Sequence, residues 1–326
     1  MTNPTTTTTT KHERIALGCM GMSRMYGDAD EAESIATIHA ALERGVELID
    51  TGDFYGQGHN ELLIGRALRD RRDRARLSVK FGALRGPDGA WLGVQDSRPA
   101  AVKNFLAYSL VRLGVDHVDV YRPARLDPAV PIEDTIGAIA DLVKAGYVRA
   151  IGLSEVGPET VRRAHAVHPI ADLQIEYSLV SRGPERAIFP VLDELGIDLT
   201  AYGVLSRGLL TGSAPQGPTD FRAYMPRFTG ANRERNQALV DALARLAAAR
   251  GTTPAALAIA WAMAKSPRVI PVVGARTRRQ LDDALVARDL RLTADDLAML
   301  EAAVPADAVA GTRYPEAMLR HMDSER

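Results

Sequence analysis

Apolar residues recur along the chain at a helical spacing. Ile35, Ile38 and Leu42 are three or four residues apart, so they lie on one face of a helix. The same spacing returns in residues 132–143 and 239–246. Between such stretches lie short runs of β-branched and apolar residues, which are typical of strands. The pattern predicts a chain in which helices alternate with short strands.

A glycine separates a helical stretch from the following strand-like run at four places, Gly45, Gly114, Gly146 and Gly196. The residue after a helix often adopts the left-handed conformation, which costs glycine little. Each unit is therefore interpreted as a helix, a tight turn and a strand. Eight strands are predicted altogether, at residues 15–18, 47–50, 77–81, 117–121, 148–153, 171–175, 198–202 and 269–273.

Eight strands that alternate with helices imply a parallel sheet, and eight such units favour a closed (β/α)8 TIM barrel of the α/β class. A doubly wound sheet is the alternative, and a Gly-x-Gly-x-x-Gly turn after the first strand would favour it. Residues 18–22 do not match that turn, and residues 56–61 begin like it but end in Glu61. We therefore predict the barrel.

Three irregular segments follow predicted strands, at residues 51–58, 82–98 and 203–233. In a barrel they open at the C-terminal face, where active sites form. The last segment is too long for an idle connection and is interpreted as a cover or lid. The expected organisation is a disordered tail at 1–12, a barrel at 13–310 and a C-terminal segment at 311–326.

Composition and charge narrow the class of protein further. The 326 residues are 46% hydrophobic and carry a formal net charge of −1, so a nucleic-acid partner is not expected. Cys19 is the only cysteine, which rules out an internal disulfide and favours a cytoplasmic protein with Cys19 as a small packed residue. No apolar run approaches the roughly 18 residues of a membrane span, and the N-terminus lacks the pattern of a signal peptide. We expect neither a membrane partner nor a metal site.

Three residues near the ends of neighbouring strands indicate acid–base chemistry. Asp50 ends the second predicted strand, Lys80 lies in the third, and Tyr55 is in the loop that follows Asp50. A free tyrosine has a pKa of about 10 and is a poor acid near neutrality. A neighbouring ammonium group lowers that pKa, and a carboxylate keeps the ammonium in place. The trio can then donate a proton to a carbonyl oxygen, although a carboxylate–lysine pair at a barrel rim is sometimes only structural.

Seven ordered motifs make the sequence recognisable. It resembles the aldo-keto reductase family over nearly its whole length, roughly residues 13–310. The resemblance implies an NADPH-dependent oxidoreductase on a barrel, which agrees with the missing glycine turn. The motifs are Leu17–Met22, Ile49–Gly56, Val79–Gly82, Gly152–Glu155, Leu173–Ser178, Ala201–Gly208 and Ile270–Arg276.

The resemblance also implies a role for each matching residue. Tyr55 would be the general acid, Lys80 its activator and Asp50 the partner of Lys80. The remaining matches would bind NADPH. Ser154 and Gln174 would hold the nicotinamide carboxamide with Glu155 beside them, Tyr202 would stack on the nicotinamide, Gly203, Leu205 and Arg207 would bind the pyrophosphate, Arg276 and Gln280 would bind the adenosine end, and Met20, Gly274 and Asp283 would complete the cofactor contacts.

Two positions depart from the family pattern. The family usually has a catalytic histidine where this chain has Ala124, and an asparagine that meets the adenine where it has Ala284. Alanine cannot donate a hydrogen bond to the substrate carbonyl. The expected substrate contacts are Met22, His59, Ala124 and Arg122. Arg122 and the neighbouring Arg125 could each supply a cationic hydrogen bond or anchor an anionic substrate, and the favoured interpretation of Arg125 is a structural ion-pair partner.

The residues and the resemblance together predict NADPH-dependent reduction of an aldehyde or ketone to an alcohol, with a small-molecule carbonyl compound as the partner. The alternative is an NADPH-binding sensor or partner-binding homologue with weak catalysis, because of Ala124. A third possibility is altered redox chemistry on a substrate that provides its own hydrogen bond. The oligomeric state is left open.

Overall fold

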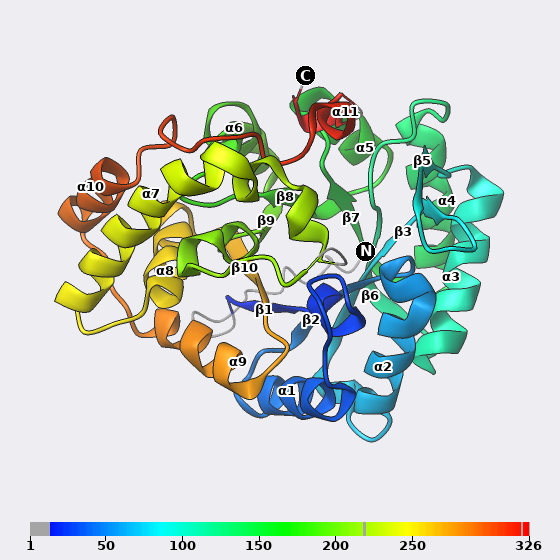
Figure 1. Ribbon diagram of the computed structural model, residues 1–326. Coiled ribbons are helices and arrows are strands. Elements are labelled where there is room, and N and C mark those ends of the chain that lie inside the picture. The colour runs from blue at the N-terminus through cyan, green and yellow to red at the C-terminus, as the bar shows by residue number, and fades with distance from the viewer. Residues whose placement is uncertain (1–13, 218–219, 321, 326) are drawn as a thin grey trace.

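The computed structural model describes residues 14–217, 220–320 and 322–325. Eight parallel strands close into a barrel in the order β1-β10-β9-β8-β7-β6-β3-β2 (Figure 1). The predicted (β/α)8 barrel and all eight predicted strands are confirmed, whereas the predicted tail lies outside the described residues. The strands are β1 Ala16–Gly18, β2 Leu48–Gly52, β3 Arg76–Phe81, β6 Val118–Pro123, β7 Val148–Ser154, β8 Ile170–Glu176, β9 Asp198–Tyr202 and β10 Val269–Gly274.

Helices surround the barrel in Figure 1 and cover the outer face of the strands. The three predicted amphipathic faces belong to α1, α4 and α7, and their apolar residues pack into the core. The helices are α1 Glu31–Glu43, α2 His59–Leu68, α3 Pro99–Leu113, α4 Ile132–Lys144, α5 Pro158–Val167, α6 Pro184–Leu195, α7 Gly230–Ala249, α8 Pro254–Lys265, α9 Arg278–Leu285, α10 Ala294–Ala303 and α11 Glu316–Leu319.

The prediction of an irregular segment at 82–98 was wrong in part. Strands β4 (Ala83–Arg85) and β5 (Trp91–Gln95) form an antiparallel hairpin there. The hairpin buries no apolar face, since Leu92 and Val94 are both exposed. It therefore lacks the alternation of buried and exposed residues by which strands are recognised in a sequence.

Side chains alternate along the barrel strands, as they must in any strand. Residues with even numbers point into the barrel, and many of them are polar. Arg122 of β6 spans the interior, since it donates to Ser78 of β3 at 2.8 Å and to Thr200 of β9 at 3.1 Å and pairs with Asp172 of β8 at 2.9 Å. The barrel therefore has a hydrogen-bonded polar centre inside an apolar shell.

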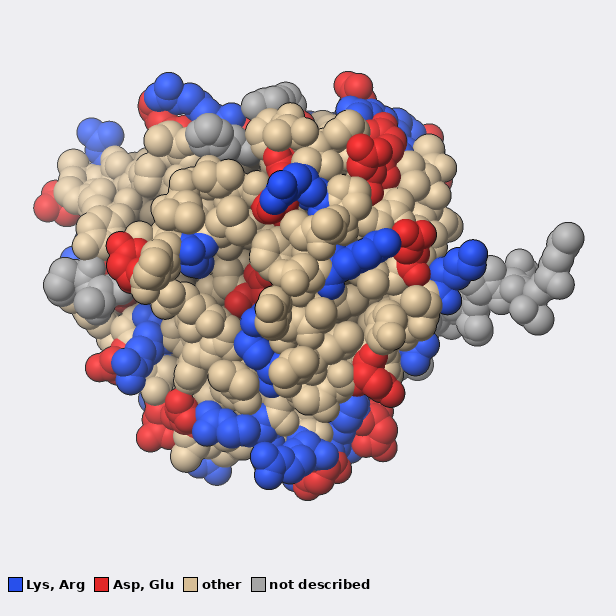
Figure 2. Space-filling view, turned by 90° about the vertical axis from the view of Figure 1, so that its right-hand side faces the viewer, with Lys and Arg blue, Asp and Glu red and all other residues tan. Residues whose placement is uncertain are grey.

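The surface matches the balanced composition. Figure 2 shows the side of the molecule that lies at the right in Figure 1, and basic and acidic side chains are interspersed over it. Cys19 is fully buried, as predicted for a packed residue. No helix in the described ranges is long and apolar enough to cross a membrane.

Candidate functional site

The predicted trio comes together at the C-terminal rim of the barrel. Nζ of Lys80 donates to Oδ1 of Asp50 at 2.5 Å, and both side chains are almost fully buried. Lys80 also lies over the ring of Tyr55, with Nζ 5.2 Å from the ring centroid. Tyr55 is 8% exposed, so the residue is almost fully enclosed. The strand ends place an acid, a base and a phenol in one cluster.

Asp50 is held from three directions. Besides Lys80, Oδ2 of Asp50 accepts hydrogen bonds from Ser78 at 3.0 Å and from Gln174 at 2.7 Å. Gln174 belongs to β8 and reaches across the barrel to do so. A buried carboxylate with one cationic partner and two neutral donors is well compensated. The lysine is therefore fixed in position beneath the phenol.

The pKa of Tyr55 is shifted in the direction opposite to the prediction. Burial raises it well above 10, and the carboxylate of Asp50 adds to the rise. Burial likewise lowers the pKa of Lys80, against the opposing effect of Asp50. Tyr55 is consequently a neutral phenol that carries its proton at ordinary pH.

Two expected carboxamide-binding residues lie side by side. Ser154 ends β7 and is paired in register with Gln174 of β8. The Oγ atom of Ser154 is buried and has no hydrogen-bond partner among the described residues. An unpartnered buried hydroxyl next to a side-chain amide fits a group that both donates and accepts hydrogen bonds, as a carboxamide does.

The segment after β9 turns sharply where a pyrophosphate is expected. Four residues between 203 and 208 have positive φ angles: Gly203 at 66°, Ser206 at 47°, Arg207 at 56° and Gly208 at 92°. Turns of this kind direct successive backbone N–H groups to one side and form anion-binding concavities. Leu205 lies within the same turn and is half-buried. The backbone here therefore fits a phosphate group.

The C-terminal segment contributes residues that the sequence did not reveal. Both guanidinium nitrogens Nη1 and Nη2 of Arg313 contact the carboxylate of Glu155, at 2.9 and 2.5 Å. The hydroxyl of Tyr202 donates to Glu155 at 2.7 Å and lies 3.1 Å from the hydroxyl of Tyr314. Nothing in the local sequence marks Arg313 or Tyr314, because their role depends on the path of the chain back to the barrel rim.

Arg207 and Glu176 form a second buried pair beside this one. Nη2 of Arg207 donates to Oε2 of Glu176 at 2.9 Å, and its guanidinium stacks on the ring of Tyr314 at 4.4 Å. Glu176 lies within the Leu173–Ser178 motif, but the family resemblance did not imply a role for it. A signal was present, because Glu176 is two residues beyond Gln174 on one strand and must face the same way.

The residues expected at the adenosine end lie on the surface around α9. The guanidinium of Arg276 donates to the carbonyls of Tyr26 and Asp28, and its backbone N–H donates to Gln280 at 3.0 Å. The loop is thus preformed. The other expected contacts nearby are Gly274 and Asp283, which are exposed, and Met20, which is half-buried.

Of the expected substrate residues, Ala124 and Met22 are buried, whereas His59 is partly exposed at the start of a helix. Ala124 follows β6 and is 2% exposed, and Met22 is buried in the core. His59 begins α2, where its ring nitrogens contact Ser23 at 2.9 Å and Glu31 at 2.7 Å. These contacts hold His59 at the helix start and turn its ring toward Glu31, which is exposed.

The expectation for Arg122 and Arg125 is reversed in the structure. Arg122 was expected to meet the substrate, but it is fully buried below the rim and paired with Asp172. Arg125 was expected to be an ion-pair partner, yet no carboxylate of the described residues lies within 4.0 Å of it. The predicted strand ended at 121, whereas β6 extends to Pro123, so Arg122 is an inward-facing strand residue.

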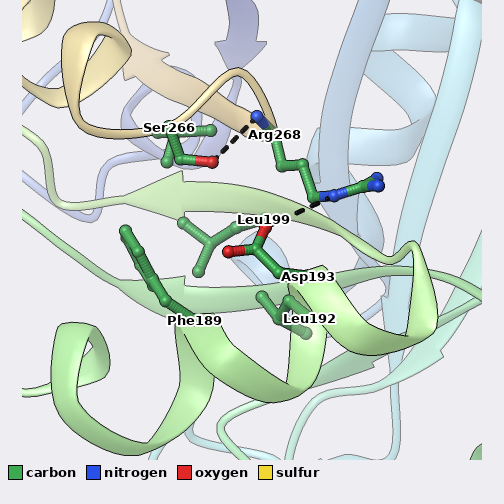
Figure 3. A pocket seen from close by; sticks show the side chains of 7 residues that line it. Phe189, Leu192, Asp193, Leu199, Ser266 and Arg268 are labelled. Atoms are coloured by element: carbon green, nitrogen blue, oxygen red, sulfur yellow. Dashed lines mark hydrogen bonds and ion pairs between the residues drawn. The ribbon is translucent and has the colours of Figure 1, made fainter.

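A small hollow lies at the other end of the barrel and is unrelated to this cluster. Figure 3 shows it between α6 and the starts of β9 and β10, with Arg268 bonded to Ser266 at 3.1 Å and paired with Asp193 at 3.5 Å. Its volume of about 10 Å³ is no larger than one water molecule needs. In the described part of the chain, no group of three His, Cys, Asp or Glu residues is arranged to hold a metal ion.

Known proteins are similar to this chain in sequence and in fold. Residues 14–305 match the model of the Aldo/keto reductase family. A probable aldo-keto reductase of Glycine max is 39% identical over 309 residues, covering 92% of this chain and 88% of the relative. The structure of a glycerol dehydrogenase from Gluconobacter oxydans has a TM-score of 0.79 at 30% identity, over 95% of this chain and 92% of the other. That of an aldo-keto reductase from Klebsiella pneumoniae in complex with NADPH has a TM-score of 0.71 at 25% identity, over 90% and 91%. The chain therefore belongs to the aldo-keto reductase family.

Proposed function

We propose that this protein reduces an aldehyde or ketone to an alcohol with NADPH, and that Tyr55 is the general acid. The observation that carries the proposal is a neutral, buried phenol beside the Asp50–Lys80 ion pair at the barrel mouth. Family membership supports an NADP-dependent oxidoreductase. The NADPH bound to the Klebsiella pneumoniae relative supports the same cofactor here.

Each residue of the trio has a distinct part in the proposed reaction. NADPH, when bound, supplies a hydride to the carbonyl carbon. The hydroxyl of Tyr55 has no hydrogen-bond partner among the described residues, so it is available to the carbonyl oxygen and donates its proton there. Lys80 lies against the ring and stabilises the phenolate that forms, while Asp50 keeps Lys80 in place.

The expected cofactor contacts follow from the positions of the family-like motifs on the rim. Ser154 and Gln174 would hold the carboxamide of NADPH, and the ring of Tyr202 would pack against its nicotinamide. The backbone of residues 203–208 with Arg207 binds the pyrophosphate, where turns with positive φ favour an anion. Arg276 and Gln280 then receive the adenosine end.

Replacing Tyr55 by phenylalanine tests the proposal directly. Tyr55→Phe keeps the ring and loses the acidic proton, so we expect kcat to fall by about two to four orders of magnitude. NADPH binding, followed by its fluorescence, is expected to persist. Tyr108→Phe is the matched control, because Tyr108 is exposed on α3. Equal kcat values for wild type and Tyr55→Phe on aldehydes would show that another group supplies the proton.

The second candidate function is an NADPH-binding sensor with weak catalysis. It is favoured by Ala124, which lies at the end of β6 where the family resemblance leads one to expect a histidine. Ala124→His discriminates between the two functions on a panel of aldehydes. If the wild type turns over aldehydes at least as fast as Ala124→His, the result supports the reductase. NADPH binding without turnover, together with large turnover after Ala124→His, supports the sensor.

A further inference from the structure

Arginines enclosed in this protein are normally paired with a carboxylate. Arg122, Arg222 and Arg227 are each at most 5% exposed. Their partners are Asp172 at 2.9 Å, Asp220 at 2.7 Å and Glu176 at 3.3 Å, respectively. Such pairing is expected, because an enclosed cation without compensation is costly.

Two half-buried arginines near Tyr55 break this rule. Among the described residues, neither Arg85 nor Arg125 has a carboxylate within 4.0 Å. Nη1 of Arg125 donates only to the carbonyl of its neighbour Ala124, at 2.5 Å, and Nη1 of Arg85 makes a long contact of 3.5 Å with the carbonyl of Gly89. The Nε atoms of both arginines are buried and have no partner.

Both guanidinium groups lie beside the phenol. The charge of Arg125 opposes the rise in the pKa of Tyr55, which burial and Asp50 cause. Arg85 lies over the ring of Phe54 at 5.8 Å, and that ring is 4.8 Å from the ring of Tyr55. Trp91, paired in register with Arg85 across the hairpin, adds a third buried donor without a partner, its indole Nε1.

The barrel topology separates these arginines from the expected pyrophosphate and adenosine contacts. Arg85 follows β3 and Arg125 follows β6, whereas the expected pyrophosphate and adenosine contacts follow β9 and β10. In the closed order β1-β10-β9-β8-β7-β6-β3-β2, β9 lies opposite β3 and β10 lies opposite β6. The two arginines therefore follow strands opposite those that carry the pyrophosphate and adenosine loops, and the charge of Arg125 reaches Tyr202 and Glu155 at the expected nicotinamide end, where the substrate carbonyl must lie.

We propose that Arg125, assisted by Arg85, binds an oxyanionic group of the substrate, a carboxylate or a phosphate. The inference rests on the proposed function, and it narrows the substrate class to carbonyl compounds that carry a negative charge. The planar guanidinium fork matches both groups, and a bound oxyanion supplies the acceptors that the buried donors lack. The anion also brings its carbonyl group up to Tyr55.

Pairs of charged and neutral substrates test whether the NADPH-bound enzyme prefers a carbonyl compound that carries a negative charge. The readout is the ratio of kcat/KM for a charged compound to that for its neutral counterpart. Suitable pairs are succinic semialdehyde with butanal, 4-carboxybenzaldehyde with 4-methylbenzaldehyde, and glyceraldehyde 3-phosphate with glyceraldehyde. The first two pairs report on carboxylates and the third reports on phosphates.

We expect the wild type to favour the charged member of at least one pair by tenfold or more, which is the size of one charge-assisted hydrogen bond. Arg125→Gln and Arg85→Gln are each expected to lower this ratio on the order of tenfold, and Arg125→Lys to lower it less. Arg149→Gln is the control, because Arg149 is exposed in the first half of β7. A wild-type ratio near or below one for every pair, or a ratio that Arg125→Gln leaves unchanged, overturns the proposal.

A binding measurement separates this proposal from the proposed reaction. Benzoate and benzamide are similar in shape, differ in charge and cannot be reduced here. Titration calorimetry on the NADPH-bound protein is expected to show tighter binding of benzoate, with the difference lost in Arg125→Gln. That result supports the anion site even if no carbonyl is turned over. Equal binding of benzoate and benzamide by the wild type counts against it, whatever the activity.

Discussion

Asp53 lies two residues before Tyr55, and its surroundings disfavour a charge. Burial raises the pKa of its carboxyl group to about 8, and the nearby carboxylate of Glu61 adds to the rise, while Arg112 opposes it. The folded protein therefore keeps a proton on Asp53 at pH 7, which an exposed aspartate would have released. The loop that carries Tyr55 thus contains a neutral carboxyl group, that of Asp53.

This shift makes the stability of the protein depend on pH. The pKa of Asp53 is higher in the folded than in the unfolded chain, so its favourable contribution is complete below about pH 4 and is lost as the pH rises to 8. The slope can reach about 1.4 kcal/mol per pH unit. We expect Asp53→Asn, which is always neutral, to flatten the fall in the urea midpoint between pH 5 and 8.

The exposed Asp73→Asn provides the comparison for Asp53→Asn, since it removes a carboxylate without a buried environment. Its midpoint is expected to follow the wild type at every pH. Parallel curves for the wild type and Asp53→Asn would mean that Asp53 is ionised in the folded protein.

Some properties of single residues could be predicted from the sequence, and others could not. The Asp50–Lys80 pair could be predicted from the residues, because strand ends in a barrel converge on one rim, whereas Ser154 and Gln174 were predicted from the family resemblance. The direction of the pKa shift of Tyr55 could not, since it depends on how completely the folded chain encloses the phenol. Arg125 was misjudged for a related reason: a missing partner is visible only when all neighbours are in place.

Strand β7 carries a glycine that the barrel interior requires. Gly152 faces inward beside the Arg122–Asp172 pair, and a Cβ atom there would lie 2.5 Å from Oδ1 of Asp172 and 3.1 Å from Cζ of Arg122. A methyl group would push the two charges out of their present contact. The identity of one residue in β7 is therefore set by a salt bridge between β6 and β8.

Gly152→Ala is accordingly expected to lower the free energy of unfolding by about 1–3 kcal/mol, as overpacking does in other cores. The matched control is Gly137→Ala in α4, where a Cβ atom would meet nothing within 4 Å. That change is expected to stabilise the protein by roughly 0.4–1 kcal/mol, because alanine favours a helix. Urea unfolding gives both values. If the urea midpoint of Gly152→Ala equals that of the wild type, the polar centre rearranges with little loss in the free energy of unfolding.

At this scale the sequence predicted the regular elements and missed the irregular ones. Four of the barrel strands were recognised because each follows a helix and a glycine, and the other four because they are short runs of β-branched and apolar residues. The β4–β5 hairpin was missed because its strands pair only with each other and leave Leu92 and Val94 exposed. Yet this hairpin carries Arg85 and Trp91, so part of the inferred substrate site lies on the element with the weakest pattern.

On the scale of the whole molecule, the C-terminal segment ties distant strands together. In Figure 1 the chain passes from α10 along one side of the barrel to α11, which lies beside α5. Arg313 contacts Glu155 after β7, and the backbone N–H of Gly157 donates to Asp323 at 2.8 Å. The segment thus closes over the rim where the nicotinamide is expected, and it compensates a carboxylate that the barrel alone leaves buried.

The ion pair between Arg313 and Glu155 allows the contribution of the C-terminal segment to stability to be measured. Burial by itself raises the pKa of the carboxyl group of Glu155, but the charge and hydrogen bonds of Arg313 outweigh burial and lower it to about 2. Removing Arg313 leaves Glu155 buried without its main partner. We expect Arg313→Ala to lower the free energy of unfolding by about 3–5 kcal/mol at pH 7, the usual cost of breaking a buried ion pair.

The pH dependence distinguishes this loss from a general loosening of the segment. In the wild type, the contribution of Glu155 is present above the unfolded pKa of about 4.3 and is lost as the pH falls toward 2. In Arg313→Ala the unpaired carboxyl group escapes its penalty by taking up a proton. The difference between the two urea midpoints should therefore shrink from pH 7 to pH 3, whereas Glu316→Ala, at an exposed position in α11, should show no difference at either pH. A constant difference would assign the loss to packing of the segment and not to the charge of Glu155.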